Sequence, residues 1–188
     1  KIYSNIELDP FYFDTKIIFI EKNLNFLIDE FLFYITDAQT EFLKNLNGIL
    51  KIKLENLENE IINNGEIILT VNEKSVDLEK SNFNISDVGS IKSEFRYIEK
   101  NGDLIFSSNN VLEIENKKSF SKKFQVKPKY INKINKIFFK LEKNVDTKEI
   151  SISNININEK SSLANNDKIY LIKNIHELKS LLKKILST

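Results

Sequence analysis

The chain of 188 residues contains no cysteine, no methionine and no tryptophan, and it has a single histidine. The absence of cysteine excludes disulfide bonds, thiol nucleophiles and cysteine-ligated metal sites. The lone His176 is not part of any recognisable catalytic motif, so Ser-His-Asp catalysis is poorly supported. No run reaches the roughly 18 consecutive apolar residues of a transmembrane helix. Because methionine is missing even at position 1, we expect the chain to be a piece of a longer protein.

Sequence signatures of other reaction centres are also missing. The chain has no Walker loop, no dinucleotide fingerprint, no EF-hand loop and no histidine spacing typical of a metal site. Its 27 acidic residues make chance pairs of carboxylates common, and sequence spacing cannot establish the two-carboxylate cleft of a glycosidase. We therefore expect a non-enzymatic protein with no catalytic residue, no metal and no cofactor.

The bulk composition indicates an ordered domain. Hydrophobic residues make up 41% of the chain, charged residues 29%, and the net charge is +1, so nothing drives the whole chain toward nucleic acid. Lysine, asparagine and isoleucine are abundant, whereas Arg96 is the one arginine. This usage is typical of AT-rich codons, so motifs built only from lysine and asparagine carry little weight.

The first 36 residues predict strands near 2–8, 11–20 and 26–35, although the last could instead be helical. Asp37 then resembles a helix N-cap, which predicts a short helix over 37–47. Gly48 follows at the position of a left-handed C-cap.

Residues 48–158 predict an antiparallel meander. From Leu50 the apolar residues recur with period two, as strands with one apolar face require. Asn-Gly and Asp-containing turn signals separate the runs, and the Asn101-Gly102 turn predicts a hairpin from Phe95 to Phe106.

The later part of the meander contains two local irregularities. Asn116 to Phe124 predicts a helical turn with Phe120 and Phe124 on one face. Residues 130–141 fit a helix or a strand, and we favour a strand for the second half because β-branched and aromatic residues dominate there. The apolar phase flips at Ser153-Asn154, which predicts a β-bulge.

Residues 159–167 predict a polar loop, and a C-terminal helix is expected near 174–187 with Leu178, Leu182 and Ile185 on one face. The expected fold is therefore mainly β (α+β), a single domain built on an antiparallel meander with one short helix and a C-terminal helix.

Charge is unevenly distributed along the chain. Residues 1–43 hold eight acids and three lysines, whereas residues 117–143 hold ten lysines and the single acid Glu142. The lysine run could bind anionic lipid head groups or nucleic-acid phosphates, or it could be a solvated face that protects a sheet edge. The scarcity of arginine argues against base-specific recognition.

The apolar strand faces leave two architectures open. Two sheets could pack as a closed sandwich, or part of the face could stay open because little helical material is available to cover it. An open apolar groove would bind lipid.

Several short sequence segments, taken in their order along the chain, resemble the C-terminal region of bacterial AsmA-like envelope proteins. They are Leu46-Asn47-Gly48, Asn64-Gly65-Glu66-Ile67, Asp87-Val88-Gly89-Ser90-Ile91-Lys92-Ser93, Arg96-Tyr97, Gly102-Asp103-Leu104-Ile105-Phe106, Phe124-Gln125, Leu141-Glu142-Lys143-Asn144 and Ile150-Ser151-Ile152-Ser153-Asn154-Ile155. The resemblance covers most of the chain and is weaker in the N-terminal third. It implies an elongated, curved, taco-like antiparallel sheet with an apolar inside, in the periplasm, within a parent anchored in the inner membrane.

The same resemblance implies transport of phospholipid between membranes or outer-membrane homeostasis, with phospholipid and other envelope proteins as partners and no nucleic acid. Candidate groove residues are Ile52, Leu54, Ile67, Leu69, Val71, Phe95, Tyr97, Leu104, Phe106, Ile137, Phe139 and Leu141. Candidate head-group contacts are Lys122, Lys123, Lys127 and Lys129. The alternative is a structural or adhesive β-sandwich that binds protein partners.

Overall fold

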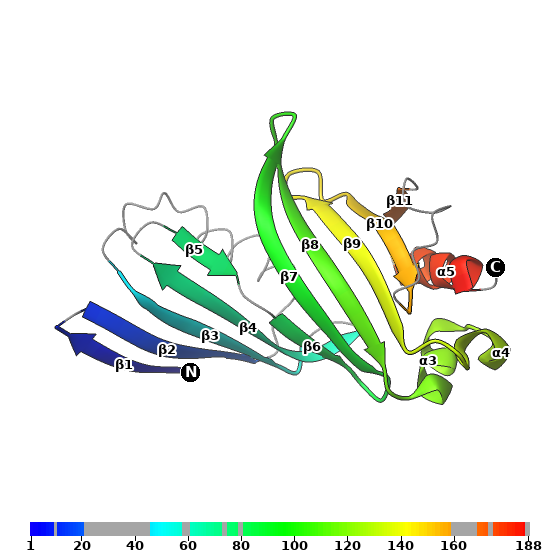
Figure 1. The fold of residues 1–188 in the computed structure, drawn as a ribbon, viewed down its shortest axis with the longest axis horizontal. Helices are drawn as coiled ribbons and strands as arrows, with labels where there is room; N and C mark the ends of the chain where they lie inside the picture. The colour runs from blue at the N-terminus through cyan, green and yellow to red at the C-terminus, as the bar shows by residue number, and fades with distance from the viewer. Residues whose placement is uncertain are drawn as a thin grey trace. The chain divides into compact units, whose positions relative to one another are not determined.

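The computed structural model describes residues 1–9, 11–20, 46–57, 61–72, 75–78, 81–158, 169–172 and 175–186, with the backbone alone for 75–78 and 175–176. The strands are β1 (Ile2–Leu8), β2 (Phe11–Ile20), β3 (Gly48–Glu55), β4 (Ile62–Asn72), β5 (Ser75–Leu78), β6 (Ser81–Ile85), β7 (Gly89–Lys100), β8 (Asp103–Ile114), β9 (Lys136–Asn144), β10 (Ile150–Ile157) and β11 (Tyr170–Ile172). The helices are α3 (Lys117–Phe124), α4 (Pro128–Ile131) and α5 (Ile175–Leu186) (Figure 1).

The protein is mainly β, as predicted. Ten strands follow one another in a single open sheet in the order β1-β2-β3-β4-β6-β7-β8-β9-β10-β11, and β5 pairs with β4 beside this series. The meander is antiparallel at β3–β4, β8–β9 and β9–β10. The β2–β3 pair is parallel, which the sequence patterns did not reveal. Parallel neighbours need a connection of a dozen or more residues, and residues 21–47 provide that length.

The chain forms two compact units. Unit 1 comprises Lys1–Asn84 and Glu94–Tyr97, and unit 2 comprises Ile85–Ser93 and Ile98–Thr188. Each unit has its own set of buried apolar side chains. In unit 1 these come mainly from β3, β4 and β6, and in unit 2 from β8 to β11 and the helices.

In unit 1, the predicted strands at 2–8 and 11–20 are confirmed as β1 and β2. The element expected at 26–35 and most of the helix expected at 37–47 lie outside the described residues. The interpretation of Gly48 as a left-handed helix cap is wrong, because Gly48 begins β3 and its φ is not positive. A Cβ there would lie 2.3 Å from the carbonyl oxygen of Phe13, so the absence of a side chain allows the close β2–β3 approach.

In unit 2, the turn between β7 and β8 falls at Asn101-Gly102, as predicted. Both turn residues have positive φ, 56° and 85°, which suits the type I′ turns that join twisted antiparallel strands. The hairpin strands are longer than Phe95 to Phe106.

Helix α3 confirms the predicted helical turn. The Asn116 side chain accepts a hydrogen bond from the Ser119 amide at 3.0 Å, and Gln125 ends the helix in the left-handed conformation. Phe120 and Phe124 are both buried, with ring centroids 4.7 Å apart. One helical face therefore anchors α3 to unit 2.

The ambiguous segment 130–141 divides as favoured, with the end of α4 first and β9 in its second half. The predicted β-bulge is also present. The β9–β10 register shifts between Ser153 and Asn156, and Asn154 has a φ of 52°. The bulge keeps Ile152 and Ile155 buried although their parities differ.

The predicted C-terminal helix is confirmed as α5, which packs against α3 and β11. Strand β11 was not predicted, because three residues after a polar stretch give no periodic signal. The expected loop at 159–167 lies outside the described residues.

Candidate apolar binding face

The apolar face of unit 1 is assembled by strand register. Directly paired residues project to the same side of a sheet, so the pairs Leu50–Leu69 and Ile52–Ile67 place four predicted apolar residues together. Ile52 and Leu69 are 0% exposed, and Leu54, Ile67 and Val71 are also buried. These side chains are sealed by the protein itself, so they form core in unit 1.

The same face continues through β2 to the edge strand β1. Ile17 pairs with Ile52 and, on its other side, with Ile2, while Phe13 pairs with Ile6. Exposure rises along this path from 0% at Ile52 to 69% at Ile2, 54% at Ile6 and 80% at Leu8. The apolar face of unit 1 therefore reaches solvent at β1 and the start of β2.

The predicted groove residues omitted this exposed strip. Alternation of Ile2, Ile6 and Leu8 with polar residues was visible in the sequence. Periodicity identifies an apolar face, but it cannot say which end of that face is left uncovered.

In unit 2, Leu112 pairs with Ile137, and Phe106 pairs with Lys143. Phe106 and Ile137 are buried, whereas Phe139 and Leu141, on the same face of β9, are half-exposed. Of the remaining candidates, Phe95 is buried and Tyr97 and Leu104 are half-exposed. Eight of the twelve predicted groove residues are thus buried and four are half-exposed.

Polar side chains interrupt the apolar face of unit 2. The Ser93 hydroxyl donates to Asn110 Oδ1 at 2.6 Å, and Asn110 Nδ2 donates to the Ser108 hydroxyl at 2.9 Å. All three residues are buried. Because their hydrogen bonds are satisfied, this cluster can fix the register of β8 without a large desolvation cost. The sequence patterns gave no sign of it, since serine and asparagine alternate with apolar residues throughout the chain.

Lys143 is the second polar feature of this face. Lys143 is 4% exposed and lies on β9, directly opposite Phe106 of β8. The interpretation of the whole lysine run 117–143 as a solvated face is therefore wrong at this position. Alternation in β9 places Lys143 on the same side as Ile137, Phe139 and Leu141.

The opposite face of each unit is charged and paired. In unit 1, Lys53 lies 2.7 Å from Glu55, and Lys51 lies 3.1 Å from Asp14. A hydrogen bond from Lys53 lowers the pKa of Glu55. Glu55 therefore stays ionised near neutral pH, which disfavours a role as a general acid.

Two carboxylates of unit 2 each sit between two lysines. Glu113 lies 2.8 Å from Lys92 and 3.2 Å from Lys136. Hydrogen bonds from these two ammonium groups lower the pKa of Glu113.

Glu142 repeats this arrangement with Lys140 at 2.6 Å and Lys100 at 3.4 Å. The hydrogen bond from Lys140 lowers the pKa of Glu142. These pairs make a solvated ladder on the polar face, where each contributes about 1 kcal/mol at most.

The four predicted head-group contacts lie on or beside the short helices of unit 2. Lys122, Lys127 and Lys129 are exposed, whereas Lys123 is half-buried. The Lys129 ammonium lies 4.7 Å from the centroid of the Tyr130 ring.

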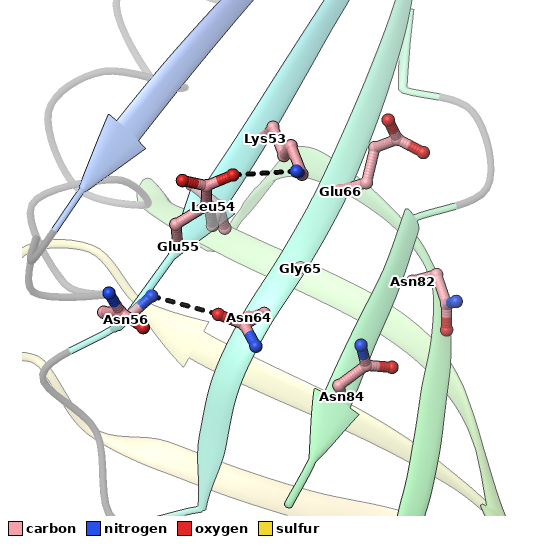
Figure 2. A pocket seen from close by; sticks show the side chains of 9 residues that line it. All are labelled: Lys53, Leu54, Glu55, Asn56, Asn64, Gly65, Glu66, Asn82 and Asn84. Carbon is pink, nitrogen blue, oxygen red and sulfur yellow. Dashed lines mark hydrogen bonds and ion pairs between the residues drawn. The ribbon is translucent and has the colours of Figure 1, made fainter.

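A polar depression of about 480 Å³ opens on the charged side of unit 1 (Figure 2). Its lining includes Lys53, Glu55, Glu66 and four amide side chains, Asn56, Asn64, Asn82 and Asn84. The backbone N–H of Asn56 donates to Asn64 Oδ1 at 3.0 Å. Such a surface can form hydrogen bonds with a polar ligand, and Leu54 is the apolar side chain in its lining.

Among the described residues, His, Cys, Asp and Glu side chains form no group of three that could hold a metal ion. In the same part of the chain, no helix has the length and apolar character needed to span a bilayer. No family model, curated protein or solved structure matches the chain.

Proposed function

We propose that this chain is a non-enzymatic sheet segment that holds the acyl chains of phospholipids against its apolar faces. The observation that carries the proposal is the gradient on unit 1, where one continuous apolar face runs from sealed core at β3 to exposed Ile2, Ile6 and Leu8 at β1. Covering a large aliphatic side chain is worth about 1.5–3 kcal/mol, so this strip favours an apolar occupant.

The acyl chain is a suitable occupant because each buried methylene contributes about 0.8 kcal/mol. Half-exposed Phe139 and Leu141 offer a second apolar contact in unit 2. Together with the resemblance to AsmA-like proteins, these features support a role in lipid transport or outer-membrane homeostasis, in the periplasmic part of a parent anchored in the inner membrane.

Replacing Ile6 with Asp is expected to weaken binding of a fluorescent fatty acyl probe by about 10-fold or more, because it places a charge in the exposed apolar strip. Tyr3→Asp is the matched control, since Tyr3 lies on the same strand, is 58% exposed and projects to the opposite face. It should change the probe affinity by less than about threefold. Equal losses in the two variants, or no probe binding by the unmodified chain, would contradict the proposal.

One observation favours the alternative, a structural or adhesive β-domain. The Lys1 nitrogen donates a hydrogen bond to the Ile18 carbonyl oxygen at 3.0 Å, and the Ile18 amide donates one to the Lys1 carbonyl oxygen at 2.8 Å. The alternating pattern of an antiparallel ladder then turns the backbone groups of Ile2, Ser4 and Ile6 outward, where an extended segment of a protein partner could pair.

The substitutions Ser4→Pro and Ser4→Ala separate the two functions. Both remove the 2.6 Å bond between the hydroxyls of Ser4 and Thr15, but only proline removes the outward amide. Lipid binding predicts equal probe affinities for the two variants, whereas strand pairing with a protein partner predicts that proline alone abolishes the complex.

A further inference from the structure

Residues 116–135 form a basic lobe, defined as α3, α4 and the segments that join and follow them. This stretch contains seven lysines and no acidic residue. On the sheet, by contrast, Lys51, Lys53, Lys92, Lys100, Lys136 and Lys140 each lie within ion-pair distance of a carboxylate. Positive charge is therefore balanced on the sheet and concentrated on the lobe.

The lobe presents its charge outward. Lys118 and Lys122, four residues apart, share one face of α3, while Phe120 and Phe124 are buried. Five lysines of the lobe are exposed: Lys118, Lys122, Lys127, Lys129 and Lys133. Within the described ranges, no carboxylate lies within 4.0 Å of any of these five ammonium groups.

Internal bonds hold the lobe in one arrangement. Lys117 Nζ donates to the Asn132 carbonyl at 2.6 Å, which ties the first turn of α3 to the segment after α4. The helices also pack against each other, and α3 packs against α5. A partner therefore meets a preformed cluster of cations.

We infer that the basic lobe docks on an anionic bilayer surface. Lysine side chains act as flexible point charges, which suit the diffuse field of a membrane carrying anionic lipids. The two phenylalanines of α3 are buried, so the lobe rests on the head groups without inserting these two rings. Nucleic acid fits less well, because the lobe has no arginine to read bases and its Tyr130 is half-buried beside Lys129.

This surface goes beyond the acyl-chain site. It uses different residues, all within unit 2, and needs no exposed apolar face.

Sedimentation with vesicles tests the inference. The full chain should bind vesicles containing about one-third phosphatidylglycerol, but not vesicles of phosphatidylcholine alone, and should be released as salt rises from about 0.1 M to about 0.5 M. The variant carrying Lys118→Gln, Lys122→Gln, Lys127→Gln and Lys129→Gln should lose at least about 100-fold in affinity, since each lysine near a charged bilayer contributes about fivefold.

A control variant with the same loss of charge carries Lys51→Gln, Lys53→Gln, Lys92→Gln and Lys100→Gln on the sheet. It should keep vesicle binding within about threefold. Equal loss in both variants, binding to uncharged vesicles, or tighter binding to an oligonucleotide than to anionic vesicles at the same salt would overturn the inference. Acyl-probe affinity in solution should be unchanged in the lobe variant, so the failure of one site is distinguishable from the failure of the other.

Discussion

Replacing Ile52 with Ala is expected to lower the free energy of unfolding by about 2–5 kcal/mol, the usual cost of deleting a buried aliphatic side chain. Ile52 is 0% exposed and is flanked on its sheet face by Ile17 and Ile67. Removing three carbon atoms there leaves a cavity between strands that cannot easily close. Urea denaturation of the two proteins under identical conditions measures the difference.

Ile49→Ala is the matched control. Ile49 lies on the same strand but projects to the opposite face and is half-exposed. We expect Ile49→Ala to lower the free energy of unfolding by about 1 kcal/mol. Comparable small losses at both positions would show that Ile52 is not core, and a stability loss that disappears when an acyl probe is added would assign it to a lipid-lined groove.

Replacing Gly89 with Ala is expected to lower the free energy of unfolding by about 3 kcal/mol or more, because backbone strain and a steric clash add. Gly89 has a φ of 152°, and a Cβ there would lie 2.0 Å from the carbonyl oxygen of Glu113. The neighbouring Val88 carbonyl accepts hydrogen bonds from the Glu115 and Asn116 amides at 2.9 and 3.0 Å. The backbones therefore cannot separate without breaking these bonds.

Gly102→Ala tests how much of this cost comes from the close approach. Gly102 also has a positive φ, 85°, but a Cβ there would meet nothing within 4 Å. Gly102→Ala should lower the free energy of unfolding by only roughly 1–2 kcal/mol, which is the cost of the backbone strain alone. Thermal melts of the two variants compare them directly, and equal shifts would contradict the proposed clash with Glu113.

Much of the fold could be predicted from local patterns. Alternation identified most of the strands, Asn101-Gly102 located the hairpin turn, and the phase flip at Ser153-Asn154 located the bulge. Each of these features depends on residues close together in the sequence, where side-chain period and turn preference act directly.

The parallel β2–β3 pair could not be predicted, because pairing direction depends on how a long connection returns to the sheet. The same limit applies to the candidate site. Alternation placed Ile52 and Leu69 on an apolar face, but periodicity does not report whether such a face is covered, and both residues are fully buried. Lys143 shows the converse, since a lysine within a basic run gave no local sign of burial.

The central claim is that phospholipid acyl chains occupy the exposed end of the apolar face. Mass spectrometry of the chain, purified from bacterial cells without detergent and sprayed under native conditions, tests this most directly. The account predicts phospholipid bound to the unmodified chain and to Tyr3→Asp, and its loss in Ile6→Asp. A chain that carries no phospholipid and binds no added acyl probe, or an Ile6→Asp variant that retains as much lipid as Tyr3→Asp, would contradict it.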